Sequence, residues 1–248
     1  MMKTLDYIRR KWQQDLRDMV FGHNYVLDGQ NFLVPKAASL VARRAIQKGL
    51  YEWPERFLVS KFLPKDLTVL ELGGSYGIVS NIIRRHIDID VRQIVVEANS
   101  DLIPICAHNV SLAGVTENTY LLSAALGYSE SGFLQFDLGS GHHSSRLVSP
   151  NKFSSEAREV PVITMSSLVD KYTEGACFSL VCDIEGAELE MLRRDGDALK
   201  KCKCLILETH PSVFLEMGSS IEEAEALISA AGLKIVAREQ DVLVAIRG

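Results

Sequence analysis

The sequence predicts an α/β protein built around a doubly wound, mostly parallel sheet with helices on both faces. From residue 68 onward, short apolar segments alternate with stretches of helical periodicity, the pattern of strands joined by crossover helices. The first such segment, TVLELGGSYGIVSNII at 68–83, also places a glycine turn between an apolar strand and a helix start. That order is typical of a nucleotide-binding βα turn.

The front of the chain is expected to be helical. Apolar residues recur at helical spacing over residues 4–21, and further helices are expected at about 36–48 and 54–63, with Pro54 suited to a first turn. We therefore predict an N-terminal helical extension over residues 1–64 and a Rossmann-like domain over residues 65–248. The extension either covers one side of the active site or only packs against the sheet.

Seven strands and four helices are expected after this extension. The strands lie at 68–73, 92–97, 119–125, 177–183, 203–209, 234–239 and 242–247, and the helices at 77–87, 100–113, 186–200 and 220–231. The last two strands are too close in sequence for a crossover and should form an antiparallel hairpin. Between 126 and 176 the alternation lapses, and strands near 132–138 and 160–165 flank a polar loop. Such an insertion often supplies the substrate-specific wall.

Composition narrows the possible partners. The chain has 248 residues, a net charge of −5 and no basic run, so nucleic-acid binding is unsupported. No apolar run approaches the ~18 residues of a membrane span, and the N-terminus lacks the apolar core of a signal peptide. The five cysteines form no CxxC pair, which favours buried, reduced thiols. We expect a cytoplasmic protein.

Acidic residues end two of the expected strands. Glu97 closes the second strand twenty positions after Gly77, where a carboxylate can accept hydrogen bonds from both hydroxyls of a ribose. Asp183 follows the apolar run FSLVC and should emerge at the carboxyl edge of the sheet, where ligands bind. Glu188 falls in the first turn of the next helix, where it either joins the site or only complements the helix dipole.

Taken together, these segments resemble the FkbM-type methyltransferase family over roughly residues 50 to 211. The resemblance is carried by VLELGGSYGIVS, by VVEAN at 95–99, by LLSAALG at 121–127, by HHSSRL at 142–147 and by VPVITMSSLVDKY at 160–172. CDIEGAELEMLR at 182–193 resembles the family's Asp-x-Glu-Gly-x-Glu signature and is the most specific segment, and LILETHP at 205–211 also fits. The resemblance implies a class I methyltransferase sheet, ending in an antiparallel hairpin strand, and S-adenosylmethionine as cofactor.

The resemblance also implies where the cofactor binds. The expected cofactor-binding residues are Glu52, Glu71, Gly73, Gly74, Ser75, Gly77, Glu97, Ala98, Asn99, Ser123, Ala124 and Asp183. Glu71 either orients the turn, contacts the cofactor's amino group or only stabilises the turn. Asn99 lies beside Glu97 or caps the following helix. Ser123 and Ala124 are the expected adenine neighbours.

The implied reaction is O-methylation of a hydroxyl on a sugar, glycan or secondary metabolite, and a hydroxyl acceptor benefits from a base. Candidate catalytic residues are Asp183, Glu185, His210 and His142 (with His143 beside it). Asp183, Glu185 and Glu208 could converge on Mg²⁺, but we expect no required metal.

Two other functions remain open at this point. A nicotinamide-dependent oxidoreductase also uses a glycine turn and an acidic ribose ligand, but it predicts GxGxxG and a Tyr-x-x-x-Lys pair. The glycine spacing of 73, 74 and 77 and the absence of that pair count against it. A non-catalytic cofactor-binding module that regulates a partner enzyme would retain the same motifs.

Overall fold

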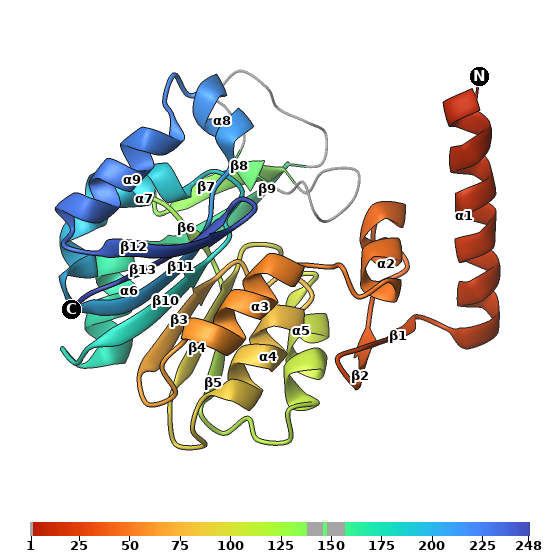
Figure 1. The fold of residues 1–248 in the computed structure, drawn as a ribbon, viewed down its shortest axis with the longest axis horizontal. Coiled ribbons are helices and arrows are strands. Elements are labelled where there is room, and N and C mark those ends of the chain that lie inside the picture. The colour runs from red at the N-terminus through yellow and green to blue at the C-terminus, as the bar shows by residue number, and fades with distance from the viewer. Residues whose placement is uncertain (1, 138–145, 148–156) are drawn as a thin grey trace.

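The centre of the protein is a seven-stranded sheet (Figure 1). The structure is a computed structural model and describes residues 2–137, 146–147 and 157–248. The strand order is β12-β13-β11-β10-β3-β4-β5. The strands are β3 (Thr68–Leu72), β4 (Gln93–Glu97), β5 (Thr119–Ser123), β10 (Phe178–Cys182), β11 (Cys202–Glu208), β12 (Lys234–Glu239) and β13 (Val242–Ile246). Only β13 runs antiparallel to its neighbours. The predicted doubly wound sheet with a C-terminal antiparallel hairpin strand is confirmed.

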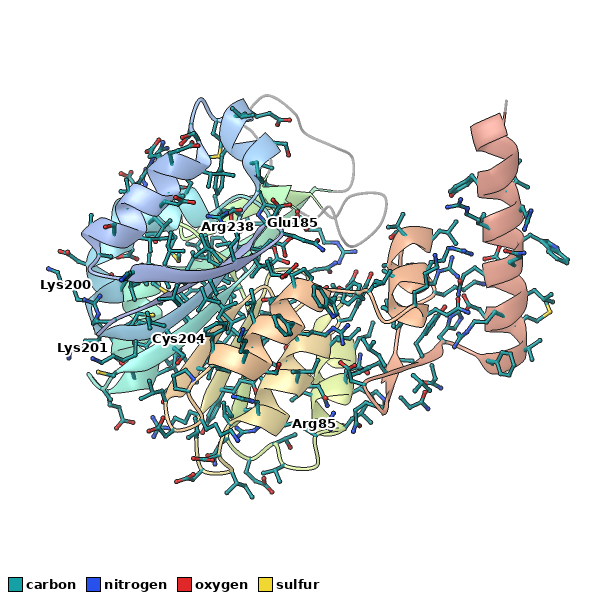
Figure 2. The ribbon with its side chains drawn as sticks, in the orientation of Figure 1. Arg85, Glu185, Lys200, Lys201, Cys204 and Arg238 are labelled. Atoms are coloured by element: carbon teal, nitrogen blue, oxygen red, sulfur yellow. The ribbon has the colours of Figure 1, made fainter. Side chains whose placement is uncertain are left out.

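Helices cover both faces of this sheet because its strands are apolar on both sides. One face packs on α3 (Trp53–Phe62) and α4 (Ile78–His86), with α5 (Ile103–Ser111) beside them. The other packs on α6 (Met165–Thr173), α7 (Glu188–Asp195), η1 (Gly196–Lys201) and α9 (Ile221–Ala230). The short α8 (Pro211–Glu216) follows β11. Figure 2 places Cys204 within the sheet and Glu185 toward its carboxyl edge.

The five cysteines are all free, and four of them are buried, as the sequence predicts. Within the described part of the chain, no helix combines the length and apolar character needed to cross a membrane.

A β-hairpin stands where the sequence suggests only a polar break after the first helix. It consists of β1 (Asn24–Leu27) and β2 (Gln30–Leu33). Its two turn residues, Asp28 and Gly29, both have positive φ, the geometry of the tight turn that Asp-Gly favours. Tyr25 and Phe32 are buried in one core with residues of α4 and the loop before it. The Asp-Gly pair was the available signal.

The region from 126 to 176 adds a second, smaller sheet. Its order is β6-β9-β7-β8, formed by β6 (Ala125–Leu126), β9 (Ala157–Ile163), β7 (Phe133–Asp137) and β8 (Arg146–Leu147). The strand expected at 160–165 ends early, because Thr164 caps α6 by accepting a hydrogen bond from the Ser167 amide at 3.1 Å.

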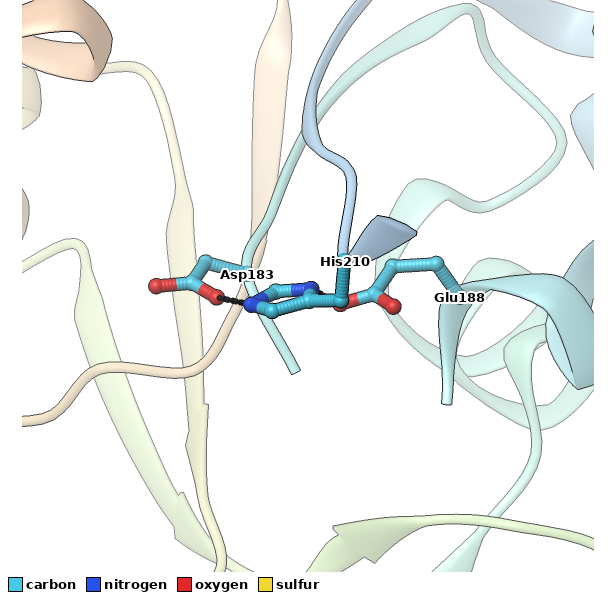
Figure 3. Close-up of side chains that lie close together, drawn as sticks. All are labelled: Asp183, Glu188 and His210. Atoms are coloured by element: carbon cyan, nitrogen blue, oxygen red, sulfur yellow. Dashed lines mark ion pairs between the residues drawn. The ribbon is translucent and has the colours of Figure 1, made fainter. Parts of the chain in front are cut away.

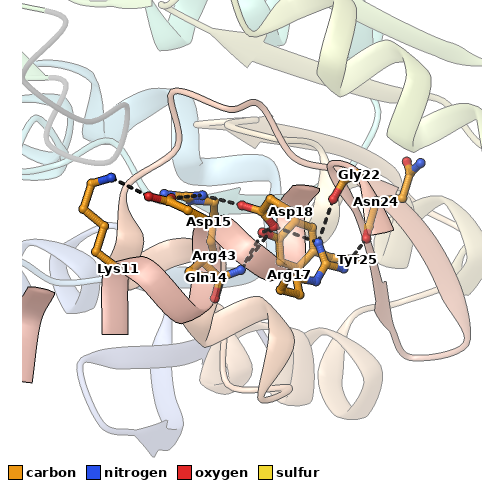
Figure 4. Close-up of polar contacts among 9 residues, drawn as sticks. All are labelled: Lys11, Gln14, Asp15, Arg17, Asp18, Gly22, Asn24, Tyr25 and Arg43. Carbon is orange, nitrogen blue, oxygen red and sulfur yellow. Dashed lines mark hydrogen bonds and ion pairs between the residues drawn. The ribbon is translucent and has the colours of Figure 1, made fainter. Parts of the chain in front are cut away.

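The first helix, α1 (Met2–Phe21), is held to the hairpin and to α2 (Leu40–Gln47) by a buried polar network (Figure 4). Asp18 is its centre: it accepts a hydrogen bond from the Tyr25 hydroxyl at 2.5 Å and pairs with Arg17 and Arg43. Burial by itself would raise the pKa of Asp18, but hydrogen bonds from Tyr25, Arg17 and Arg43 outweigh it and lower that pKa. The carboxylate is therefore ionised and paired.

Asp18→Asn should lower the free energy of unfolding by about 3 kcal/mol, because it removes the buried carboxylate nearest to Arg43 and leaves only the exposed Asp15, at 3.7 Å, to pair with it. Since the pKa of Asp18 is lowered in the fold, its contribution is present above the unfolded pKa of ~3.9 and is lost as pH falls. Urea denaturation at neutral pH measures the change. Asp15→Asn is the control, because the Asp15 side chain is 45% exposed and such pairs contribute about 1 kcal/mol or less. Equal effects of the two substitutions would contradict the assignment.

Candidate active site

The glycine turn after β3 is packed too tightly for side chains. A Cβ on Gly73 would lie 1.8 Å from the Asp183 carbonyl oxygen, and one on Gly74 would lie 2.5 Å from Val95 Cγ1. A Cβ on Gly77 would lie 2.8 Å from the Cys106 backbone. Gly73 and Gly77 also have φ of +94° and +76°, which glycine adopts readily. These three glycines let β10 and α5 approach the turn while its backbone stays bare.

Glu97, at the end of β4, is bonded to this turn. Its Oε2 accepts a hydrogen bond from the Ser75 amide at 2.7 Å, and its Oε1 accepts one from the Asn99 amide at 2.6 Å. Burial raises the pKa of the Glu97 carboxyl, and the amides of Asn99, Ser75 and Ala98 oppose the shift. A carboxylate has about four acceptor positions, so about one remains for another donor. Glu97 is thus fixed in place and still able to accept from a ligand.

The other residues expected near adenine and ribose gather beside Glu97. Ser123 lies opposite it in the register of β4 and β5, and the Ala124 amide donates to the Glu97 carbonyl at 3.1 Å. Ala98 is half-buried, and Asn99 is buried with its side-chain oxygen accepting the amide two residues on. The structure brings these residues together at one edge of the sheet.

Glu71 lies elsewhere. It shares a sheet face with Val95 and Val181, and its carboxylate accepts hydrogen bonds from Ser80 Oγ at 2.6 Å and Gln93 Nε2 at 2.8 Å. Burial raises its pKa to about 7, against the effect of both bonds. Glu71 therefore ties β3 to α4 and β4, which agrees with the turn-stabilising alternative and leaves its cofactor contact a prediction.

Glu52 reaches the site from the front of the chain. It precedes α3 with a φ of +46° and is half-buried. Its pKa is raised well above the ordinary value by burial and by the charges of Asp183, Glu208 and Glu71. Glu52 therefore faces the carboxyl edge of the sheet, where the sequence analysis expects it.

The Asp-x-Glu-Gly-x-Glu segment meets His210 at the same edge (Figure 3). His210 Nδ1 lies 3.2 Å from Glu188 Oε1, while Nε2 lies 3.5 Å from Asp183 Oδ1 and 3.7 Å from Glu185 Oε2. Glu188 is fully buried and also accepts the Ile184 amide at 2.8 Å. Its role therefore exceeds that of a helix-dipole residue, because it holds both its own turn and the imidazole.

The charges of this group are shared. Burial alone would lower the pKa of His210, but Glu188, Asp183 and Glu185 outweigh it and raise that pKa to about 9. Burial raises the pKa of Asp183 to about 6, against the opposing charge of His210. At neutral pH the imidazole is therefore a cation between carboxylates.

A second group of carboxylates adjoins Asp183 on its other side. Glu55, Asp183 and Glu208 each place an oxygen within 4.8 Å of the others. At an effective dielectric constant of ~20, two like charges at that separation repel by roughly 3 to 4 kcal/mol. Burial is the largest cause that raises the pKa of Glu208 to about 8 and the pKa of Glu55 well above its ordinary value.

Glu55 was not among the residues predicted for the site. The available signal was its spacing: Glu52 and Glu55 are three residues apart at the start of a helix and so share one face. His142 and His143 lie outside the described residues, so His142 remains a sequence prediction.

Comparison with known proteins identifies the family. The model of the methyltransferase FkbM domain matches residues 71–235, which include the glycine turn, Glu97, Asp183 and His210. The chain belongs to the FkbM methyltransferase family. Among curated proteins, none matches the sequence.

Several solved structures align with this chain. A protein of the NADB-Rossmann superfamily from Streptococcus agalactiae aligns at 16% identity and a TM-score of 0.45, over 78% of this chain and 68% of that one. The ribosomal protein L11 methylase of Lactobacillus delbrueckii subsp. bulgaricus aligns at 13% identity and a TM-score of 0.45, over 78% of each chain. M. capricolum TrmK, solved with S-adenosylhomocysteine, aligns at 10% identity and a TM-score of 0.44, over 78% of this chain and 67% of that one. Similarity at this level defines no activity, so the family match carries the identification.

As a member of this methyltransferase family, the protein uses S-adenosylmethionine, and the nicotinamide alternative is set aside. The residues present fit this cofactor. The bare turn from Gly73 to Gly77 leaves backbone groups open, and Glu97 keeps an acceptor position for a ribose hydroxyl. Since S-adenosylmethionine has no pyrophosphate, the missing GxGxxG is no obstacle.

Glu97→Gln should weaken S-adenosylhomocysteine binding by about 10- to 100-fold, because hydrogen bonds to a charged group contribute about 1.5–3 kcal/mol. Calorimetric titration of both proteins measures the loss. Glu174→Gln is the control: it removes one charge from an exposed glutamate that precedes β10, at the opposite end of that strand from Asp183, so affinity should hold. Unchanged affinity in Glu97→Gln would remove Glu97 from the binding site.

Proposed function

We propose that this protein is an O-methyltransferase that transfers the methyl group to a hydroxyl of a sugar, glycan or secondary metabolite. The observation that supports this proposal is His210 at the carboxyl edge of the sheet, 3.2 Å from buried Glu188. A neutral hydroxyl must lose its proton as it is methylated, and a positioned histidine is the commonest group to take it.

The roles of the residues follow from the two ring nitrogens. The charge of Glu188, with Oε1 3.2 Å from Nδ1, favours the tautomer that carries its proton on Nδ1, and Nε2 is then the free base. Nε2 faces Asp183 and Glu185, toward the half-exposed side of the cluster. When bound, the cofactor supplies a methyl group on a sulfonium, which leaves as a neutral thioether. The hydroxyl proton passes to Nε2, and Asp183 stabilises the imidazolium that forms.

The segments around this edge are proposed to select the acceptor. They are the front of the chain up to residue 64 and the insertion that forms the smaller sheet. In the front segment, Glu55 places an oxygen within 4.8 Å of oxygens of Asp183 and Glu208 at that edge, and in the insertion β6 directly follows β5. Loops and additions on a rigid scaffold are the usual carriers of such specificity.

Acceptor class can be tested with a methyl-labelled cofactor and a panel of sugars, glycans, phenols and amines. We expect labelled methyl ethers and an equal amount of S-adenosylhomocysteine. Label on nitrogen or carbon would overturn O-methylation while leaving the methyltransferase assignment intact. Binding of the cofactor with no turnover on any class would instead favour a regulatory module.

His210→Gln should lower kcat by about 10²- to 10⁴-fold, the usual contribution of a general base. A base acts only when deprotonated, so kcat/KM of the wild type for the cofactor should rise with pH and level off above the His210 pKa of about 9. His210→Gln should lose that rise. His108→Gln, on the exposed side of α5, is the control and should match the wild type. An unaltered pH profile in His210→Gln would assign the base elsewhere.

A further inference from the structure

Three carboxylates converge at the carboxyl edge without a cation between them. Glu55 comes from the first turn of α3, Asp183 follows β10 and Glu208 ends β11. Their oxygens lie within 4.8 Å of one another. Segments far apart in the sequence thus contribute one oxygen each to a single point.

Glu55 is the informative member of this group. It is only 5% exposed, and among the described residues it has neither a hydrogen bond nor an ion pair. An acidic residue in the first turn of a helix is stabilised by the helix dipole. Such residues usually face solvent or a free backbone amide. Glu55 instead faces two more carboxyl groups, and its side chain has no nitrogen donor or cation beside it among the described residues.

The neighbouring cluster of Asp183, Glu188 and His210 already contains a positively charged partner. There the imidazole supplies the positive charge at 3.2 to 3.5 Å from the carboxylates. In the described structure no lysine, arginine or histidine forms an ion pair with Glu55. The space between Glu55, Asp183 and Glu208 is therefore where a positive partner would fit.

We propose that Glu55, Asp183 and Glu208 form a binding site for a divalent cation of the oxygen-preferring class, Mg²⁺ or Mn²⁺. All three ligands are carboxylate oxygens, which these ions favour over nitrogen or sulfur. Asp183 and Glu208 are only partly buried, so the ion can enter and keep part of its water shell. The sequence alone favours no metal, because Glu55 is separated from the other two ligands by more than a hundred residues.

The ion would also restrict which hydroxyl compounds can serve as the methyl acceptor. This step rests on the proposed O-methylation: an ion held by Asp183 lies beside the proposed base and can bind the acceptor hydroxyl in place of water. Such binding lowers the pKa of the hydroxyl. Acceptors with a second oxygen next to the methylated hydroxyl, such as vicinal diols, would then be preferred because both oxygens can bind the ion.

The site is tested on the full chain without cofactor or acceptor, so failure of the proposed reaction does not affect the result. Metal-stripped protein is titrated calorimetrically with MnCl₂ and MgCl₂. We expect one saturable site per chain and at least tenfold weaker binding in Glu55→Gln and Glu208→Gln. Glu216→Gln, which removes one charge from the exposed end of α8, is the matched control and should bind as the wild type does.

Thermal melting provides a second readout. Mn²⁺ should raise the Tm of the wild type, whereas Glu55→Gln should melt higher than the wild type in chelator and respond little to Mn²⁺. No saturable binding up to about 10 mM, above the ~10⁻³ M of weak protein sites, would overturn the proposal. So would Mn²⁺ binding that Glu55→Gln leaves unchanged. Loss of S-adenosylhomocysteine affinity in Glu55→Gln without any metal binding would overturn it too, by assigning the carboxylates to the cofactor's ammonium group.

Discussion

The close approach of β10 to the glycine turn after β3 is the constraint on which the site depends. The Asp183 amide donates to the Leu72 carbonyl at 2.9 Å, and the Asp183 carbonyl occupies the space that a Cβ of Gly73 would need. On the other side of β3, the Gly73 amide donates to Val96 at 2.9 Å. One turn is thereby clamped between two strands. Glu97 and Asp183 are held at a fixed separation as a result.

This arrangement concentrates negative charge. Seven carboxylates border the edge: Glu52, Glu55, Glu97, Asp183, Glu185, Glu188 and Glu208. Only His210 offsets them within the described site, and its raised pKa is the direct consequence. Such a cluster opposes folding unless protons or cations compensate it. Clusters of like charge are retained mainly at functional sites, because the negative potential that opposes folding also attracts a cationic ligand.

Much of this site could be predicted from local pattern. Glu97 and Asp183 follow apolar strands directly, so counting strand ends places both at the carboxyl edge. Counting strand ends does not predict which way the Glu71 side chain points. It also lies near a strand end, but residues alternate between sheet faces, and a shift of one position turns the side chain toward α4.

What local pattern could not supply is contact between distant segments. Glu55 joins the site only because α3 packs against β11, which brings its side chain to Asp183 and Glu208. The β1–β2 hairpin had a local Asp-Gly signal, but its stability comes from a core shared with Tyr76 and Ile78. Packing of this kind depends on the assembled sheet, and periodicity within one segment does not report it.

Asp183 belongs both to the group with Glu188 and His210 and to the group with Glu55 and Glu208. A cation bound near Asp183 would therefore also affect the proton on His210. A positive sulfonium near Asp183 would draw on the same carboxylate that faces His210, and would lower the pKa of the imidazole toward a working range. A divalent ion on Glu55, Asp183 and Glu208 would act in the same direction. Without such ligands, His210 is the cation that faces Asp183, and its raised pKa reflects that charge. A cation bound on Asp183 would share this compensation, so the imidazole would release its proton at lower pH in the loaded protein.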